Sequence, residues 1–193
     1  MKTIVLATNN NHKLAEFRQI LHEYNILSLK DIEFYNEIIE DGNSFAENAL
    51  IKAKTISNYL LEQNKEYIVI ADDSGLCVES LNNEPGIYSA RYAGINATDY
   101  DNRMKLLNEL KNKDKEAYFN CTIVIYYPTD EYKIVNGQTF GKITEEENGS
   151  NGFGYDSIFY SYELNKTFGQ ASEEEKNKVS HRSKAIEELI KII

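Results

Sequence analysis

The sequence predicts an α/β fold with a mixed β-sheet flanked by helices. Apolar runs of strand length alternate with amphipathic helical segments in the first half, and two longer β segments, 118–127 and 132–140, follow in the second half. A chain of 193 residues is slightly longer than one average domain and too short for two full domains. We therefore expect one domain over residues 1–193, with its core divided into two lobes.

The first half begins with a strand, a polar loop and a helix. Thr3–Ala7 is an apolar run bounded by polar residues, which is typical of a strand buried on both faces. The loop Thr8–Lys13 follows, and Leu14, Phe17 and Leu21 then keep helical spacing. The chain therefore opens with the strand-to-helix connection from which α/β folds are built.

A second helix is predicted to begin at Ser44. Ser44 and Glu47 form an S-x-x-E capping box, in which the two side chains can satisfy free backbone N–H groups of the first turn. Apolar residues then line one face of the helix: Phe45, Ala49, Ala53, Ile56 and Leu60. The next strand, Tyr67–Ala71, is expected to end abruptly at Asp72.

The second half is expected to hold a helix, a hairpin and a terminal helical segment. The helix should begin at Thr98, and its apolar positions are Met104, Leu107 and Leu110. The two β segments should pair as a hairpin around a turn, residues 128–130. Helical spacing returns from Ser172 onward, at Val179, Ile186 and Leu189.

Composition and charge exclude several classes of partner. The 41% hydrophobic and 27% charged residues are those of an ordinary folded protein. A net charge of −10 without a Lys/Arg stripe argues against binding nucleic acid. The sequence has no signal peptide and no apolar run of about 18 residues, so we expect no membrane association. Cys77 and Cys121 lie in predicted strands, which favours buried free thiols in the reducing cytoplasm.

The loop after the first strand is a candidate phosphate site. Thr8, Asn9, Asn10 and Lys13 offer a hydroxyl, two amides and a cation beside the free N–H groups of a helix N-terminus, and such groups hold phosphate oxygens. The G-x-x-x-x-G-K-[ST] pattern of a P-loop is absent. A polar turn that only caps its helix remains an equal alternative.

Two adjacent carboxylates, Asp72 and Asp73, follow a buried strand. Backbone alternation should send them in different directions, one toward a cleft and one toward the scaffold. Mg²⁺ prefers carboxylate oxygen and needs only one or two protein ligands, since water and substrate phosphate complete its shell. The alternative is that both aspartates cap a turn or lie in solvent.

The segment Gly152–Asp156 places aromatic rings among glycines, which let the backbone approach a ligand closely. This arrangement suits a planar base, and stacking on Phe153 would contribute about 1–3 kcal/mol. A core aromatic residue in a turn is the alternative.

Lys176 and His181 can face one ligand only if the terminal helix breaks between them. On an unbroken helix they would lie about 140° apart. Ser180 can cap a new helix, which would leave His181 and Arg182 in its first turn with donors available to a ligand. A cationic helix on the surface is the alternative.

Six motifs in order resemble the inosine triphosphate pyrophosphatase family, also called the Ham1-like family, from about residue 3 to the C-terminus. They are Thr8–Lys13 with Glu16, Ser44–Ala49, Ile70–Leu76, Pro85–Tyr92, Phe153–Asp156 and Ser180–Arg182. The resemblance implies a two-lobed α/β fold with an elongated mixed sheet, an active-site cleft between the lobes, and usually a homodimer. It also implies Mg²⁺-dependent hydrolysis of purine nucleoside triphosphates with a wrong base (ITP, dITP, XTP) to monophosphate and pyrophosphate.

The resemblance further implies roles for single residues of this chain. Asp73 would be metal ligand and general base, and Ser74 would contact substrate beside it. The triphosphate would be held by Thr8, Asn9, Asn10, Lys13 and Lys52. The base and sugar would be received by Phe153, Gly154, Tyr155 and Asp156. Lys176 would neutralise phosphate or contact the base, while His181 and Arg182 would read the purine 6-position.

The sequence departs from the family pattern before the second helix. Relatives often carry Glu-Glu-x-Gly there, with the first Glu as a metal ligand, whereas this chain reads Ile39-Glu40-Asp41-Gly42. Glu40 is the expected second ligand, and Glu37 after a local shift is the alternative.

Two rival functions stay open. The first is a Maf-like pyrophosphatase acting on pyrimidine or modified triphosphates, which the Ser-His-Arg ending opposes. The second is a nucleotide-binding regulatory module without catalysis, which Asp73 and Lys13 oppose, because function rests on sites rather than on fold.

Overall fold

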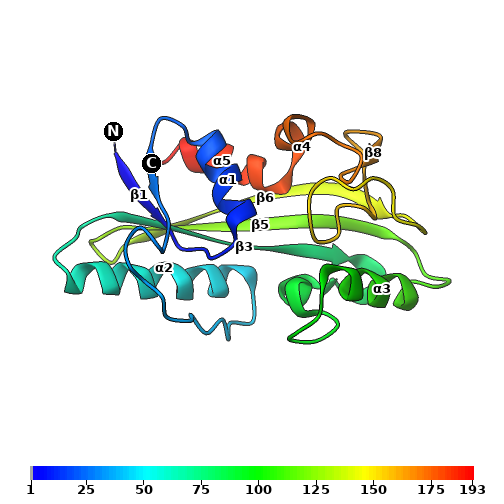
Figure 1. Cartoon of the computed structure of the whole chain (residues 1–193), viewed down its shortest axis with the longest axis horizontal. Coiled ribbons are helices and arrows are strands. Elements are labelled where there is room, and N and C mark those ends of the chain that lie inside the picture. The colour runs from blue at the N-terminus through cyan, green and yellow to red at the C-terminus, as the bar shows by residue number, and fades with distance from the viewer. Residues whose placement is uncertain (1) are drawn as a thin grey trace. The chain divides into compact units, whose positions relative to one another are not determined.

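The computed structural model describes residues 2–193 (Figure 1). Its strands are β1 Thr3–Leu6, β2 Asn25–Leu27, β3 Ile68–Val78, β4 Glu84–Pro85, β5 Glu116–Tyr126, β6 Tyr132–Ile143, β7 Phe159–Ser161 and β8 Lys166–Thr167. Its helices are α1 Asn11–Ile20, α2 Phe45–Glu62, α3 Asp99–Glu109, α4 Glu173–Val179 and α5 His181–Ile190, with short 3-10 turns η1 Glu79–Leu81 and η2 Gly86–Arg91.

The strands of this described range form one eight-stranded mixed sheet in the order β2-β1-β3-β5-β6-β7-β8, and β4 pairs with β3. β1 is parallel to β2 and β3, whereas β7 is antiparallel to β6 and β8. The predicted α/β class with a mixed sheet is thus confirmed.

The chain forms two compact units. Unit 1 is Met1–Asp73, Thr122–Asn136 and Ala185–Ile193; unit 2 is Ser74–Cys121 and Gly137–Lys184. Two units agree with the two lobes expected from the length of the chain. The cleft that the resemblance implies stays a prediction.

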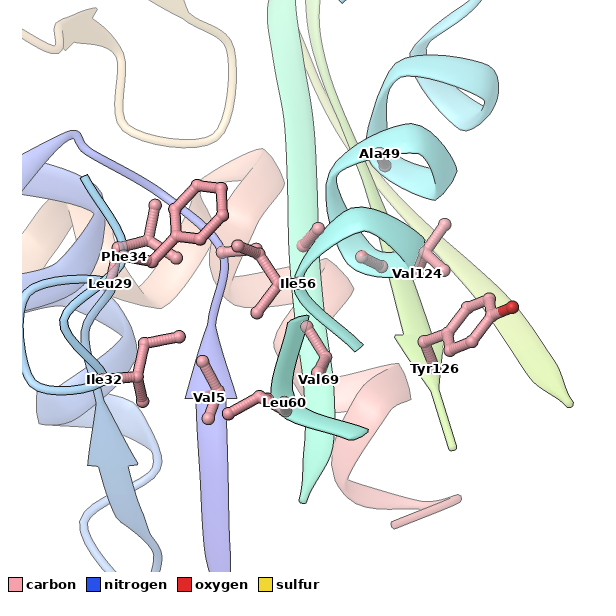
Figure 2. Packing of buried hydrophobic residues seen from close by; sticks show 13 residues of the cluster. Val5, Leu29, Ile32, Phe34, Ala49, Ile56, Leu60, Val69, Val124 and Tyr126 are labelled. Carbon is pink, nitrogen blue, oxygen red and sulfur yellow. The ribbon is translucent and has the colours of Figure 1, made fainter. Parts of the chain in front are cut away.

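The core of unit 1 lies between α2 and the strands (Figure 2). Ala49, Ala53, Ile56 and Leu60 of α2 are buried, as the spacing predicts. Figure 2 shows Ile56 and Leu60 near Val5 of β1 and Val69 of β3, with side chains from the segment after β2 completing the cluster: Leu29, Ile32 and Phe34. Burying each large aliphatic side chain stabilises the fold by about 1.5–3 kcal/mol.

The N-terminus of α2 differs in one detail from the predicted capping box. Ser44 Oγ accepts a hydrogen bond from the Glu47 amide at 3.2 Å, as expected. The Glu47 carboxylate, however, accepts from the Asn43 amide at 2.6 Å rather than from that of Ser44. The box is therefore displaced by one residue, and it holds the chain just before α2, between Gly42 and Ser44.

Unit 2 has its own core of aromatic and aliphatic side chains. The Phe119 and Phe159 rings lie edge to face at 4.7 Å, and Phe168 lies 5.1 Å from Phe159. α3 begins after Thr98 as predicted, and Thr98 forms a reciprocal capping box with Asp101. Leu106 is fully buried in this core. The apolar positions predicted for the helix, Met104, Leu107 and Leu110, do not include it.

Two predicted boundaries require correction. β3 does not end at Asp72 but continues to Val78, because Leu76, Cys77 and Val78 are buried and the last two residues pair with β4. β6 runs to Ile143 rather than Phe140, and its last three residues pair with β7.

Three other predictions are confirmed. β5 and β6 are neighbours joined by the turn around residues 128–130. The terminal helical pattern breaks at Ser180, which has an extended backbone between α4 and α5. Cys77 and Cys121 are buried, and within residues 2–193 they form no disulfide bond. No helix in residues 2–193 has the length and apolar character needed to cross a membrane.

Candidate active site

The two adjacent aspartates of β3 face different partners in unit 1. Asp72 is fully buried, and its Oδ2 lies 2.9 Å from Lys13 Nζ of α1. Asp73 instead accepts a hydrogen bond from Asn48 Nδ2 of α2 at 3.1 Å. Figure 1 shows α1 and α2 on opposite faces of these strands. Strand alternation therefore separates the carboxylates as predicted, although both stand within a strand and not in a turn.

Asp73 belongs to a cluster with Lys52 and Glu40. Lys52 Nζ lies 2.7 Å from Glu40 Oε2 and 3.9 Å from Asp73 Oδ1. Glu40 is therefore the carboxylate of the Ile39–Gly42 stretch that reaches the cluster, whereas Ile39 is 75% exposed. This geometry supports Glu40 as the expected second acidic residue.

Burial and charge oppose one another in this cluster. Burial raises the pKa of Asp73 and outweighs Lys52, Lys13 and the Asn48 amide, which lower it. Burial lowers the pKa of Lys52, but the carboxylates of Asp73, Asp72 and Glu40 outweigh it, so the net pKa is raised. Lys52 thus stays a cation beside a carboxyl group that burial makes a stronger proton acceptor.

Asn48 also belongs to this cluster, although the resemblance implies no role for it. Its Nδ2 donates to Asp73, and its Oδ1 accepts from the Gly42 amide at 2.9 Å. The second bond fixes which end of the amide faces Asp73. Asn48 and Lys52 are four residues apart and share one face of α2, so two polar residues at helical spacing on an otherwise apolar face were the available signal.

The loop Thr8–Lys13 caps α1. Asn10 Oδ1 accepts hydrogen bonds from the amides of His12 at 2.9 Å and Lys13 at 3.2 Å. Thr8 Oγ1 accepts from the Asn10 amide at 3.2 Å, and Asn9 is exposed. The capping alternative thus describes the Asn10 side chain, whereas the Lys13 ammonium group pairs with Asp72 within β3, the strand next to β1.

A second group of predicted site residues lies in unit 2, around the turn Gly152–Asp156. Asp156 Oδ2 accepts from the Phe153 amide at 2.9 Å and from Lys176 Nζ at 2.7 Å. Lys176 Nζ also stands 4.9 Å from the centre of the Phe153 ring. Lys176 therefore lies against both Asp156 and Phe153, and its contact with phosphate or with the base stays a prediction.

Gly152 is required in this turn. Its φ is +76°, which side chains rarely adopt, and a Cβ there would lie 2.0 Å from Asp156 Oδ2. The glycine therefore allows the buried Asp156 carboxylate to come within hydrogen-bonding distance of the turn's own backbone.

The Ser-His-Arg motif lies in the same unit. Arg182 Nη2 donates to Ser74 Oγ at 3.1 Å. The His181 ring stacks on Phe119, with centroids 4.8 Å apart and planes 13° from parallel. Ser180 Oγ accepts from the Ser183 amide at 3.1 Å, so it caps α5 as the sequence predicts. His181 and Arg182 consequently stand in a first helical turn and are both buried.

The predicted residues thus form two groups. Unit 1 brings Asp73 together with Lys52 and Glu40, and Lys13 with Asp72. Unit 2 joins Ser74 to Arg182, and Phe153 to Asp156 and Lys176. Tyr155 lies in the second group as well, and its hydroxyl donates to the Ser89 carbonyl at 2.8 Å. A buried carboxylate beside cations can accept a proton from water, and cations can stabilise phosphate charge.

Comparisons with known proteins give the family. The model of the Ham1 family matches residues 4–192. A dITP/XTP pyrophosphatase of Clostridium perfringens is 47% identical, over 98% of this chain and 96% of the relative. A protein of the same name from Bacillus subtilis is 43% identical, over 100% and 98%.

Solved structures agree with the sequence comparison. The Staphylococcus aureus Ham1 protein is 44% identical with a TM-score of 0.87, and the match covers 97% of this chain and 96% of that one. A HAM1 protein from Coxiella burnetii is 38% identical with a TM-score of 0.89, covering 100% and 98%. The chain therefore belongs to the Ham1 family.

Proposed function

We propose that this protein hydrolyses purine nucleoside triphosphates with a wrong base, such as ITP, dITP and XTP, to the monophosphate and pyrophosphate. The observation that carries the proposal is the cluster around Asp73, in which a buried carboxyl group is held by Asn48 and faces Lys52. The names of the relatives, dITP/XTP pyrophosphatase, support the same reaction and substrate class.

Mg²⁺ is the proposed cofactor, with Asp73 and Glu40 as its protein ligands. Both carboxylates stand beside Lys52 Nζ, so their oxygens face a common region of unit 1. Within residues 2–193 no group of three or more potential metal ligands occurs. Two carboxylates suffice for Mg²⁺, which takes its remaining ligands from water and substrate phosphate. When bound, the ion would neutralise charge on the triphosphate.

The residues of unit 1 would handle the proton and the phosphate charge. Asp73 would accept a proton as a water oxygen forms a bond to the α-phosphorus and the bond to the bridging oxygen breaks. Its raised pKa suits it to this role, because a stronger base holds the proton better. Lys52, and Lys13 with the Thr8–Asn10 loop, would stabilise the pyrophosphate that leaves.

The residues of unit 2 would select the base. Phe153 would stack on the purine, with Asp156 and Lys176 beside it. The Arg182 guanidinium has only hydrogen-bond donors, so it can satisfy a 6-keto oxygen and would leave the 6-amino group of adenine without an acceptor. A site that leaves such groups unpaired rejects the wrong ligand strongly. His181, stacked on Phe119, would add a second polar contact at the purine 6-position.

The setting that fits this proposal is cytoplasmic, where nucleotide pools lie and thiols stay reduced. It is supported by Cys77 and Cys121, which are buried and form no disulfide bond within residues 2–193.

The test is pyrophosphate release from ITP, XTP, dITP, ATP, GTP and dTTP, each with Mg²⁺ and with EDTA. Selective release from the inosine and xanthosine compounds that stops in EDTA is expected. Cleavage of dTTP in preference to ITP would favour the Maf-like alternative. If pyrophosphate is released from none of the six, the proposal is overturned and the nucleotide-binding module without catalysis is favoured.

A further inference from the structure

Helix α3 binds the turn Gly152–Asp156 from outside through two of its side chains. Asp99 Oδ2 accepts a hydrogen bond from the Gly154 amide at 2.8 Å. Arg103 Nη1 donates to the Gly154 carbonyl oxygen, also at 2.8 Å. Asp99 and Arg103 are four residues apart, so they share one face of the helix. Both backbone polar groups of a single residue are thus held by one helix.

The two bonds fix more than Gly154 itself. The bound N–H belongs to the peptide plane between Phe153 and Gly154, and the bound C=O belongs to the plane between Gly154 and Tyr155. Holding both planes sets the directions in which Phe153 and Tyr155 leave the turn. Gly154 has a φ of +60°, a conformation that glycine reaches at no steric cost but does not hold by itself. The two bonds from α3 therefore add to the bond between Asp156 and the Phe153 amide in keeping the turn in one shape.

Further contacts extend the same support to the end of the turn. Arg103 Nε also pairs with Glu147, whose Oε1 accepts from Ser157 Oγ at 3.1 Å. Arg103 therefore bridges Gly154 and, through Glu147, Ser157. A guanidinium can serve both partners because its donors point in several fixed directions, which an ammonium group does not match.

We propose that Asp99 and Arg103 are positioning residues for base recognition, holding Phe153 and Asp156 in the arrangement that receives a 6-keto purine. This inference rests on the proposed function, in which the turn binds the base. Asp99 and Arg103 belong to unit 2, whereas the Asp73 cluster belongs to unit 1. Their removal should accordingly weaken nucleotide binding and leave the rate of the chemical step nearly unchanged.

The experiment compares variants of α3 in the full-length protein. Asp99→Ala removes the acceptor for the Gly154 amide, and Asp99→Asn retains an acceptor oxygen without the charge. Arg103→Met keeps the aliphatic stem and removes the donors. Lys111→Met is the control, since it also replaces a cation by methionine, at an exposed residue just after α3. For each, kcat and KM for ITP and ATP are measured, and the Kd of IMP is determined by calorimetry.

Asp99→Ala should raise KM for ITP and Kd for IMP by about three- to tenfold, the cost of one hydrogen bond. Arg103→Met should raise both at least as much, because it loses the Gly154 bond and the Glu147 pair. Their kcat should stay within about twofold of wild type, and Asp99→Asn should recover most of the loss. In the double variant, the rise in Kd for IMP should be about threefold smaller than the product of the rises in the two single variants, because both bonds hold the same residue. Lys111→Met should behave as wild type.

A merely structural role would give a different result. Lower thermal stability with unchanged Kd for IMP would overturn the inference. The same would follow if Asp99→Asn raised KM for ITP and Kd for IMP as much as Asp99→Ala does. A fall in kcat with unchanged KM would also overturn it. If wild-type protein neither binds IMP nor releases pyrophosphate from ITP, the proposed function fails and the inference fails with it. An active wild type with unaffected variants overturns the inference alone.

Discussion

Asp72 and Asp73 show how neighbouring identical residues acquire different chemistry. Asp72 is fully buried and pairs with Lys13, which neutralises it. Asp73 accepts the Asn48 N–H and lies near a lysine that it shares with Glu40. Alternation along a strand is readable from the sequence, so the separation of the two carboxylates could be predicted. The partners that distinguish them come from α1 and α2 and could not be assigned from spacing alone.

Asp73→Asn should abolish most turnover without destabilising the fold. Loss of the proposed base should lower kcat by about 10²–10⁴-fold. Burial raises the pKa of Asp73, so the folded protein binds this proton more tightly than the unfolded chain does. The ionised form therefore costs stability at neutral pH, and that cost disappears as the pH falls toward and below the pKa. A neutral Asn removes the cost, so the melting temperature without metal should equal or exceed that of wild type. Near-normal turnover would contradict the role of Asp73.

Asn48→Ala should impair both activity and stability. It removes the N–H that orients Asp73 and leaves the half-buried Gly42 amide without its acceptor, which costs about 1 kcal/mol. We expect at least a tenfold loss of kcat/KM and a lower melting temperature. Asn58→Ala is the control, because Asn58 is an exposed asparagine of the same helix. Equal behaviour of the two variants would show that Asn48 has no special role.

Arg182→Lys should narrow the preference for ITP over ATP. An ammonium group keeps the charge but not the fixed directions of the guanidinium donors. Loss of a charged hydrogen bond to the 6-keto oxygen should reduce the ITP-to-ATP ratio of kcat/KM by roughly tenfold or more. The measurement is that ratio in the variant and in wild type. An unchanged ratio would move base recognition to other residues.

At the scale of single elements, the break between α4 and α5 was predictable and the length of β3 was not. Lys176 and His181 could face one ligand only across a break, and Ser180 supplied a cap at the right place. The polar run Asp72–Gly75 predicts the end of a strand. β3 continues through this run because Ser74 and Gly75 are followed by buried apolar residues that pair with β4. The sequence does not reveal this pairing, since β4 has only two residues and shows no periodicity.

Ser180→Ala tests the break as a functional feature. Loss of an N-cap costs about 1 kcal/mol, and it should loosen the first turn of α5 that holds His181 and Arg182. We expect a several-fold rise in KM for ITP. Ser180→Thr is the matched control, since a threonine hydroxyl can cap the same turn and should leave KM for ITP near the wild-type value. Similar KM values in both variants would contradict the assignment.

At the scale of the whole molecule, the class of fold followed from the sequence and the pairing of short strands did not. The strand-to-helix opening, the α2 stripe and the β5–β6 hairpin are long, periodic signals. β7 and β8 have three and two residues, too few for a pattern, and their pairing depends on contacts far along the chain. The candidate site followed the same rule: motifs indicated most of its residues, whereas the contacts that give Asn48, Asp99 and Arg103 their roles appear only in three dimensions.

The resemblance to the family implies a homodimer, which stays a prediction for this chain. Light scattering coupled to gel filtration should give a mass near twice the 22.2 kDa of one chain, independent of dilution over the working range. A mass near 22.2 kDa at all concentrations would contradict the dimer without affecting the proposed chemistry.

The most direct test of the central claim identifies the phosphorus products of ITP hydrolysis by ³¹P nuclear magnetic resonance in the presence of Mg²⁺. The account predicts IMP and pyrophosphate in equal amounts from wild type, with neither formed by Asp73→Asn on the same timescale. Formation of IDP and orthophosphate, or equal product from the two proteins, would contradict it.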